Sequence, residues 1–278
     1  LRIGREIGKG AFGRVFMASA IKLPGFSGPK IVAIKQLKKC SSSDEFDEFL
    51  DEITMMKKVG KHPNIVALLG CCTIKEPLTM IMEYVGCGDL VQYTPVKKRT
   101  YNVNANSVTK HYSEIDCSLE YVLDHKELHN FAKQIAFGME HLEGLHITHR
   151  DLAARNILID ERKTLKISDF GLSRTGIYVN TRNKKVPLRW LSIEAMRDNL
   201  YSNKSDVWAF GIVLWEIGTL GGYPYPSVSN HELFAYLQEG KRLERPENCT
   251  VDVYDLMLQC WREDPNERPS FQQISKHL

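Results

Sequence analysis

The feature that most constrains this chain is the segment His149-Arg150-Asp151-Leu152-Ala153-Ala154-Arg155-Asn156, with Asp169-Phe170-Gly171 beginning 18 residues after Asp151. It holds a carboxylate placed to accept a hydroxyl proton, Asp151, and an amide five residues later, Asn156. Asp169 adds a second carboxylate, and carboxylate and amide oxygens are ligands of hard cations such as Mg²⁺. Any one Asp-rich turn is usually structural, but these groups in this order are the parts that phosphoryl transfer requires.

A second motif lies near the start of the chain, where Gly8-Lys9-Gly10-Ala11-Phe12-Gly13-Arg14-Val15 has the pattern Gly-x-Gly-x-x-Gly-x-Val. Glycines let backbone amides approach phosphate groups where a Cβ would obstruct them. The same glycine spacing occurs in dinucleotide-binding turns, but those lead into a helix. Residues 14–17 have the pattern of a strand, which favours a phosphate-binding loop between two strands.

Lys35 follows the apolar run Val32-Ala33-Ile34 and lies 22 residues after Gly13. Downstream, apolar residues at intervals of three and four predict a helix over 44–59. Glu52 lies on the apolar side of that helix, where an unpaired charge is costly. We therefore predict an ion pair between Lys35 and Glu52 rather than an exposed strand lysine.

Two regions of different pattern indicate an α+β chain with two lobes. Residues 1–83 contain short strand-like runs and the one helix, whereas helical patterns dominate from about residue 129. Those patterns cover residues 128–145, 204–218, 231–238, 251–261 and 271–278. The glycine-containing segment 85–89 suits a hinge between the lobes. The polar segment 93–124 has no sustained period and is predicted to be an insertion.

Composition excludes several classes of protein. The formal charge is +3, from 37 basic and 34 acidic residues that are intermixed, so no nucleic-acid partner is expected. The seven cysteines have no zinc-site spacing and suit a reducing compartment. No signal peptide opens the chain, and the longest apolar run, 207–215, is shorter than the roughly 20 residues of a membrane span. We expect no membrane contact within this segment, which we interpret as a piece of a larger protein.

On these motifs the chain resembles a protein kinase over nearly all of its 278 residues. Ala153-Ala154-Arg155 and Pro187-Leu188-Arg189-Trp190 are similar to tyrosine kinases, since serine/threonine kinases usually carry Lys where this chain has Ala153. The insertion and the run from Leu220 to Tyr225 resemble receptor tyrosine kinases such as the fibroblast growth factor, Ret and Tie receptors. Ser192-Ile193-Glu194 departs from the usual Ala-Pro-Glu.

The resemblance implies a bilobal kinase domain over residues 1–278 with an ATP cleft between its lobes. The implied parts are an N-lobe at 1–82, a hinge at 83–89, a C-lobe at 90–278, an insert at about 93–124 and an activation segment at about 169–194. The implied cofactors are ATP and Mg²⁺, with Mn²⁺ as a substitute metal.

The same resemblance implies the catalytic roles. Lys35 would hold the α- and β-phosphates and Glu52 would hold Lys35. Asp151 would be the base for a tyrosine hydroxyl that Arg155 helps to orient. Metal ligands would be Asn156 and Asp169.

The resemblance also implies which residues bind ATP. Val15, Ala33 and Leu158 would enclose the adenine, the backbone of Glu83 and Val85 would bond its edge, and Asp89 could reach the ribose. Met82 would be the gatekeeper of the back pocket. The full predicted set is Gly8, Lys9, Gly10, Ala11, Phe12, Gly13, Val15, Ala33, Lys35, Met82, Glu83, Val85, Asp89 and Leu158.

Other implied roles are structural or regulatory. Glu194 would form a buried ion pair with Arg268, Asp206 would anchor the catalytic loop, and Phe170 would stack with His149, Met56 and Leu68. Tyr178 is the single tyrosine between Asp169 and Pro187. Its phosphorylation would place negative charge near a set of basic residues and order the segment. These residues are Arg150, Arg174, Arg182, Lys184 and Lys185.

The expected activity is phosphate transfer from ATP to tyrosines of protein substrates, with autophosphorylation and self-association. The resemblance implies the cytoplasmic domain of a single-pass plasma-membrane receptor. Tyr101, Tyr112 and Tyr121 of the insert are either docking sites for phosphotyrosine-binding adaptors or solvated loop residues. The rival interpretations are a cytosolic tyrosine kinase and a pseudokinase scaffold. Pseudokinases usually lack equivalents of Lys35, Asp151 or Asp169, and this chain has all three.

Overall fold

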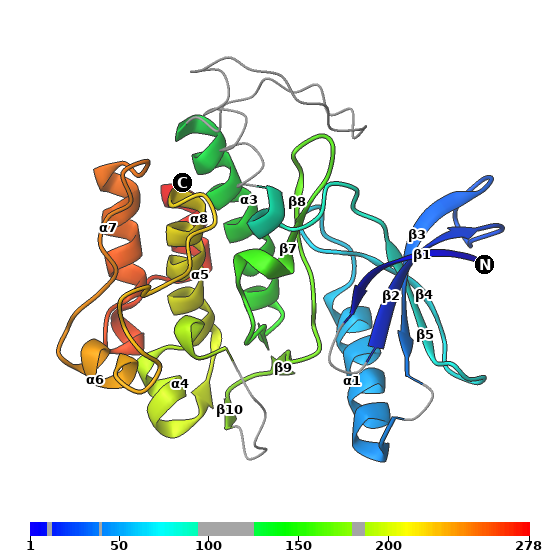
Figure 1. The fold of residues 1–278 in the computed structure, drawn as a ribbon, viewed down its shortest axis with the longest axis horizontal. Coiled ribbons are helices and arrows are strands. Elements are labelled where there is room, and N and C mark those ends of the chain that lie inside the picture. The colour runs from blue at the N-terminus through cyan, green and yellow to red at the C-terminus, as the bar shows by residue number, and fades with distance from the viewer. Residues whose placement is uncertain (10–12, 39–40, 94–124, 180–186) are drawn as a thin grey trace, which may run out of the picture.

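The computed structural model describes residues 1–9, 13–38, 41–93, 125–179 and 187–278. The predictions for Gly10, Ala11 and Phe12, for the three insert tyrosines, and for Arg182, Lys184 and Lys185 lie outside the described residues. Figure 1 shows a sheet accompanied by one helix at the right of the view, and a larger group of helices at the left. The predicted α+β architecture with two lobes is confirmed.

The smaller lobe is a five-stranded antiparallel sheet in the order β1-β2-β3-β5-β4. Its strands are β1 (Arg2–Lys9), β2 (Gly13–Ala20), β3 (Lys30–Leu37), β4 (Leu68–Cys72) and β5 (Thr79–Glu83). Val15 pairs with Lys35, and Ala33 pairs with Met82. Because side chains alternate along a strand and paired residues share a face, these four side chains project from one face of the sheet.

Helix α1 (Ser43–Val59) accompanies this sheet and begins one residue before its predicted start. The Ser42 side chain accepts from the Glu45 backbone N–H while the Glu45 carboxylate accepts from Ser42 N–H, so two exposed donors of the first turn are satisfied. Phe49 and Ile53 are buried, and so is Glu52. The buried side of the helix therefore carries two carboxylates, those of Glu52 and Glu48.

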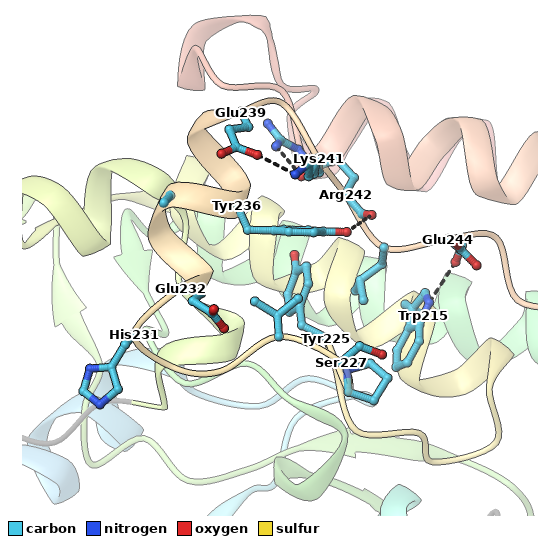
Figure 2. Close-up of a pocket in the computed structure, with 14 residues that line it drawn as sticks. Trp215, Tyr225, Ser227, His231, Glu232, Tyr236, Glu239, Lys241, Arg242 and Glu244 are labelled. Carbon is cyan, nitrogen blue, oxygen red and sulfur yellow. Dashed lines mark hydrogen bonds and ion pairs between the residues drawn. The ribbon is translucent and has the colours of Figure 1, made fainter.

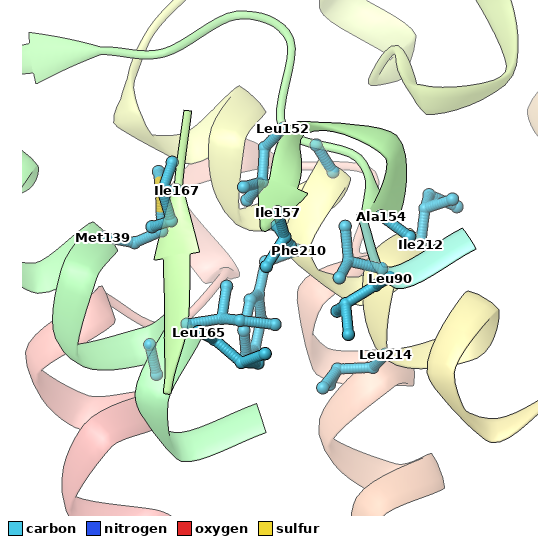
Figure 3. Packing of buried hydrophobic residues seen from close by; sticks show 14 of the residues in the cluster. Leu90, Met139, Leu152, Ala154, Ile157, Leu165, Ile167, Phe210, Ile212 and Leu214 are labelled. Atoms are coloured by element: carbon cyan, nitrogen blue, oxygen red, sulfur yellow. The ribbon is translucent and has the colours of Figure 1, made fainter. Parts of the chain in front are cut away.

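The larger lobe is built around α5 (Asn203–Gly218), whose residues from Ser205 to Gly218 are all buried. Around it lie α3 (His125–Gly144), α7 (Val251–Cys260) and α8 (Phe271–His277), while α6 (Leu233–Gln238) lies near one end (Figure 1). Figure 3 shows Phe210, Ile212 and Leu214 of α5 packed with Leu152 and Ile157, which flank the predicted catalytic residues. The core of this lobe thus reaches directly under that segment.

Several short elements had no sequence prediction, because a segment of two to six residues shows no measurable period. They are the strands β6 (Ile147–Thr148), β7 (Ile157–Ile159), β8 (Leu165–Ile167), β9 (Arg174–Thr175), β10 (Tyr178–Val179) and β11 (Leu200–Tyr201), the helix α4 (Ile193–Asp198), and the 3₁₀ turns η1 (Ala154–Asn156), η2 (Leu188–Trp190) and η3 (Pro265–Glu267). The predicted helix over 231–238 begins two residues later than expected, since Ser229 and Glu232 form the preceding turn. Within the described part of the chain, no helix has the length and apolar character of a membrane span.

A buried ion pair joins α4 to the segment before α8. Arg268 donates to both carboxylate oxygens of Glu194, at 2.7 and 2.8 Å, and its side chain is fully buried. The same guanidinium also donates to the carbonyls of Arg262, Lys204 and Glu263. The predicted Glu194–Arg268 pair is therefore present, and every guanidinium nitrogen has a partner.

We expect Arg268→Ala to lower the free energy of unfolding by about 3–5 kcal/mol, because it leaves a buried carboxylate without its cation. Chemical denaturation with tryptophan fluorescence measures the change. The matched control is Arg262→Ala, which removes the exposed pair with Glu267 and should cost less than about 1 kcal/mol. Equal losses in the two variants would contradict this account.

Candidate active site

Lys35 is held in the cleft by the carboxylate of Glu52. Its Nζ lies 2.7 Å from both Glu52 oxygens and 3.9 Å from Asp169 Oδ1. The Lys35 and Glu52 side chains are mostly buried, whereas that of Asp169 is 51% exposed. Burial alone would lower the pKa of Lys35, but the attraction of Glu52 and Asp169 outweighs it and raises that pKa. The predicted ion pair is present, and it leaves the ammonium fully charged.

The catalytic loop begins at β6 and is fixed from below by α5. Asp206 Oδ2 accepts the His149 N–H at 2.7 Å, and Oδ1 accepts the Arg150 N–H at 2.9 Å. Arg150 has φ of 70°, a left-handed conformation that non-glycine residues adopt only when their surroundings enforce it. The Asp206 carboxylate supplies that enforcement, because it receives two successive N–H groups.

Asp151 is oriented by two neighbours from the same loop. Arg155 forms an ion pair with Asp151 Oδ1, and Asn156 Nδ2 donates to Asp151 Oδ2 at 2.9 Å and to the Asp151 carbonyl at 2.7 Å. Burial raises the pKa of Asp151, although Arg155 opposes the shift. A carboxylate with a raised pKa, fixed at the mouth of the loop, has the properties of a general base.

The residues predicted as metal ligands can be tested against the chemistry of their donor atoms. Because the Asn156 amide nitrogen is used by Asp151, the amide oxygen is the atom free to meet a cation. Asp169 presents a half-exposed carboxylate, and Asp169 Oδ1 also lies near Lys35. Mg²⁺ typically takes one or two protein oxygens and completes its shell with phosphate and water. Asn156 and Asp169 therefore fit such an ion.

Phe170 and His149 pack together behind Asp169. Their ring centroids lie 5.1 Å apart in an edge-to-face arrangement, and both are buried. Burial lowers the pKa of His149 to about 4, so the ring is neutral near pH 7, and His149 Nε2 contacts the Ser168 carbonyl. Met56 belongs to the same buried cluster, with Leu68 packed against it. With Phe170 inside and φ of 62° at Asp169, the Asp169 carboxylate faces the cleft.

Two glycines of the phosphate-loop motif have different structural reasons. A Cβ at Gly13 would lie 2.8 Å from the Gln36 carbonyl, so the sheet itself requires glycine there. Among the described residues, a Cβ at Gly8 would meet only the Val15 side chain, at 3.7 Å, which is an ordinary contact. The strands therefore do not explain Gly8, and a ligand that approaches the backbone would. Lys9, at the end of β1, pairs with Arg14.

The predicted adenine residues come from the sheet of the smaller lobe and from β7 of the larger one. Val15, Ala33 and Met82 share a face of the sheet, and Leu158 lies on β7, where it bridges Asp89. Asp89 Oδ1 accepts the Gln92 N–H at 2.9 Å, so one oxygen of the predicted ribose ligand already caps a helical turn.

The hinge segment is bonded to both lobes. Cys87 N–H donates to the Ile159 carbonyl, and Ile159 N–H donates to the Gly88 carbonyl, each at 3.0 Å. Val85 is buried. The Glu83 carboxylate, which the sequence does not flag, accepts the Ala67 N–H at 2.7 Å and lies 3.0 Å from Lys166 Nζ.

Tyr178 lies against the guanidinium of Arg150. In the β10–β11 pair Tyr178 is opposite Tyr201, and the Arg150 Cζ lies 4.4 Å from the Tyr178 ring centroid and 4.3 Å from that of Tyr201. Arg174 lies 5.8 Å from the Tyr178 ring. Arg150 Nε is buried with no hydrogen-bond partner among the described residues. The predicted proximity of Tyr178 to Arg150 and Arg174 is present.

Trp190 lies under the side chain of Arg155, which pairs with Asp151. The Arg155 Cζ lies 4.5 Å from the Trp190 ring centroid, and Trp190 Nε1 donates to Glu216 Oε2 at 2.9 Å. Arg189 fixes the adjacent backbone by donating to the carbonyls of Pro224, Tyr225 and Val228. The sequence analysis missed Glu216. The signal was available, because Glu216 and Asp206 are the only acids of the apolar helix α5.

One cavity lies outside this group of residues. It has a volume of about 750 Å³ and is lined by Trp215, Tyr225 and residues of α6 and the segment after it (Figure 2). Lys241 pairs there with Glu239, and Tyr236 donates to the Arg242 carbonyl. None of the predicted catalytic or ATP-binding residues lines it. This cavity is therefore separate from the candidate active site.

Comparison with known proteins agrees with this geometry. The model of the protein tyrosine and serine/threonine kinase family matches residues 1–278, so the chain belongs to that family. It is 41% identical over 289 residues to fibroblast growth factor receptor 1 of Xenopus laevis, and 39% identical over 282 residues to a fibroblast growth factor receptor of Strongylocentrotus purpuratus. Fibroblast growth factor receptor 1 of Pleurodeles waltl is 41% identical over 284 residues.

Each alignment covers all of this chain but only 28–34% of the relative. The chain thus spans about a third of the length of these receptors, to which it is similar. The resemblance inferred from the motifs is confirmed.

We expect Lys35→Met to lower kcat by about 10²- to 10³-fold, because it removes a preorganised positive charge from the cleft. The double variant Lys35→Met/Glu52→Gln should have nearly wild-type thermal stability, because Glu52→Gln removes the carboxylate charge that Lys35→Met alone would leave unpaired. The matched control is Lys30→Met, on the same strand but over the Phe26 ring. Steady-state assays of ADP release measure the effect, and wild-type turnover in Lys35→Met would contradict it.

Proposed function

We propose that the chain is the catalytic domain of a receptor-type kinase that transfers the γ-phosphate of ATP to tyrosine hydroxyls of proteins. The observation that carries the proposal is the Asp151 carboxylate, which is held by Arg155 and Asn156 and interacts with the charge of Asp169, itself 3.9 Å from Lys35. A phosphate acceptor bound at Asp151 and a phosphate donor bound at Lys35 would meet between them. Positioning of this kind supplies most of the catalysis in phosphoryl transfer.

The reaction uses the residues as follows. Lys35 would hold the α- and β-phosphates, and Asn156 and Asp169 would hold Mg²⁺, which would neutralise charge on the transferred oxygens. The tyrosine oxygen forms a bond to the γ-phosphorus as the bond from that phosphorus to the bridging oxygen of ADP breaks. The phenolic proton passes to Asp151. ADP leaves with the electron pair of the broken bond.

Preference for tyrosine is supported by the floor of the site. A phenol reaches further from the peptide backbone than a serine hydroxyl, so its substrate must be supported at a greater distance from Asp151. Trp190, stacked under Arg155, gives a rigid surface at that place. Ala153 is buried, and it has no charged side chain at the position where serine/threonine kinases usually have a lysine.

The whole protein is proposed to be a plasma-membrane receptor with this domain in the cytoplasm. The support is that the relatives are receptors and that the chain spans about a third of their length. Two copies would phosphorylate each other, and insert phosphotyrosines would recruit adaptors. These partners are proposals that follow from the receptor assignment.

We expect Asp151→Asn to lower kcat for a tyrosine peptide by about 10²- to 10⁴-fold, because the general base is lost. Transfer of radiolabelled phosphate from ATP and Mg²⁺ measures it, with a serine peptide of the same flanking sequence as the acceptor control. Asp198→Asn, an exposed aspartate of α4, is the matched variant and should keep wild-type activity. An inactive wild type would instead favour a scaffold.

The pH dependence follows from the raised pKa of Asp151. The rate should rise with pH as this carboxylate ionises, with its acid limb above the ordinary aspartate range, because burial disfavours the charged form. The acid limb should disappear in Asp151→Asn.

We expect phosphorylation of Tyr178 to raise kcat, because phosphate oxygens would supply acceptors to the unpartnered Nε of Arg150 and charge to Arg174. After incubation with ATP and Mg²⁺, the phosphorylated wild type should exceed Tyr178→Phe in turnover. Tyr254→Phe, in α7 far along the chain from the segment, is the control. If Tyr178→Phe matched the pre-phosphorylated wild type, this regulation would be refuted.

A further inference from the structure

Glu216 is a buried carboxylate to which no role has been assigned above. It lies near the end of α5, is 4% exposed, and is surrounded along the helix by apolar residues. A carboxylate in such a place is unfavourable unless its oxygens have partners. Burial raises the pKa of Glu216 to about 7, although its hydrogen bonds to Trp190 and Ala154 oppose the shift. Burial of the Glu216 carboxylate is therefore unfavourable by itself. The groups that hydrogen-bond to it indicate what it does in the fold.

Those partners come from two different loops of the active site. Glu216 Oε2 accepts the Ala154 backbone N–H at 3.0 Å and the Trp190 Nε1–H at 2.9 Å. Ala154 opens η1, which carries Arg155 and Asn156, whereas Trp190 closes η2. One oxygen atom thus bonds both the predicted catalytic loop and Trp190, whose ring would support the substrate.

The connection continues to the reacting group. The guanidinium of Arg155 lies over the Trp190 ring at 4.5 Å and pairs with Asp151. The positive charge of Arg155 also lowers the pKa of Glu216, which favours the ionised carboxylate. Glu216 therefore fixes Arg155 twice, through the backbone of the preceding residue and through the ring beneath its side chain.

The two acids of α5 divide the support of the catalytic loop between them. Asp206 binds the N–H groups of His149 and Arg150 at the start of the loop, and Glu216 binds the N–H of Ala154 toward its end. Ten residues of helix separate them, a rise of about 15 Å. A single rigid helix thus holds the loop at two points, with Asp151 between them.

We propose that Glu216 is a positioning residue that sets the placement of Arg155, and through it of Asp151, relative to the bound tyrosine. The inference rests on the proposed tyrosine-kinase function. It predicts a defect in the transfer step and in the acceptor site, while the nucleotide site at Lys35 is unaffected.

Steady-state kinetics with a tyrosine peptide test the proposal. Glu216→Ala should lower kcat by about ten- to a hundred-fold, because small displacements of a positioned group cost that much, while KM for ATP stays at the wild-type value. Glu216→Gln retains an acceptor oxygen and should restore kcat. The matched control, Trp215→Phe, removes an indole bond from the same helix, to the Glu244 carbonyl, and should keep wild-type kcat.

Hydrogen exchange provides a readout without substrate. In Glu216→Ala, the amides of residues 154–156 should exchange faster, whereas those of His149 and Arg150 should keep their protection because Asp206 still holds them. If Glu216→Ala does not fold, Trp190→Phe removes one of the two bonds and leaves a ring under Arg155; its kcat should fall while KM for ATP stays constant.

The outcomes separate this inference from the proposed function. An inactive wild type with the expected exchange pattern would overturn the proposed function but not the anchoring by Glu216. A folded Glu216→Ala with wild-type kcat, or one that loses ATP affinity together with kcat, would overturn the role of Glu216. Wild-type kcat in a folded Trp190→Phe would do the same.

Discussion

The active site depends on the two hydrogen bonds that Asp206 accepts from the start of the catalytic loop. These bonds hold Arg150 in a left-handed conformation. That conformation sets the direction of the backbone at the next residue, Asp151. A buried carboxylate is expensive, so its cost must be met by partners of good geometry. Here they are successive backbone N–H groups, and the residues of α5 on either side of Asp206 are buried as well. The buried helix α5 consequently fixes the backbone geometry of the candidate catalytic loop.

The smaller lobe contributes a second buried charge arrangement. Lys35 and Glu52 come from a strand and a helix, so their contact fixes α1 against the sheet while it aims the ammonium at the cleft. Asp169, from the larger lobe, lies 3.9 Å from Lys35. Charges from both lobes therefore meet where a polyphosphate would bind, and displacement of α1 would separate them.

Motifs with chemical meaning were predictable from the sequence, and contacts made across the fold were not. The Lys35–Glu52 and Glu194–Arg268 pairs followed from motif spacing and family resemblance, and helices such as α1 followed from periodicity. The short strands that bring Tyr178 opposite Tyr201 have too few residues to show a period. Glu216 escaped attention because its partners, a backbone N–H and an indole, carry no sequence signature. Its isolation in an apolar helix was the one clue.

The central claim is that this cleft places a tyrosine oxygen at Asp151 and a γ-phosphate beside it. It is tested most directly by a crystal structure of the chain with a non-hydrolysable ATP analogue, Mg²⁺ and a tyrosine peptide. The account predicts the phenol oxygen within hydrogen-bond distance of the Asp151 carboxylate, with Lys35 on the α- and β-phosphates and the phenol ring supported near Trp190. A nucleotide bound away from Lys35, or a phenol turned away from Asp151, would contradict it.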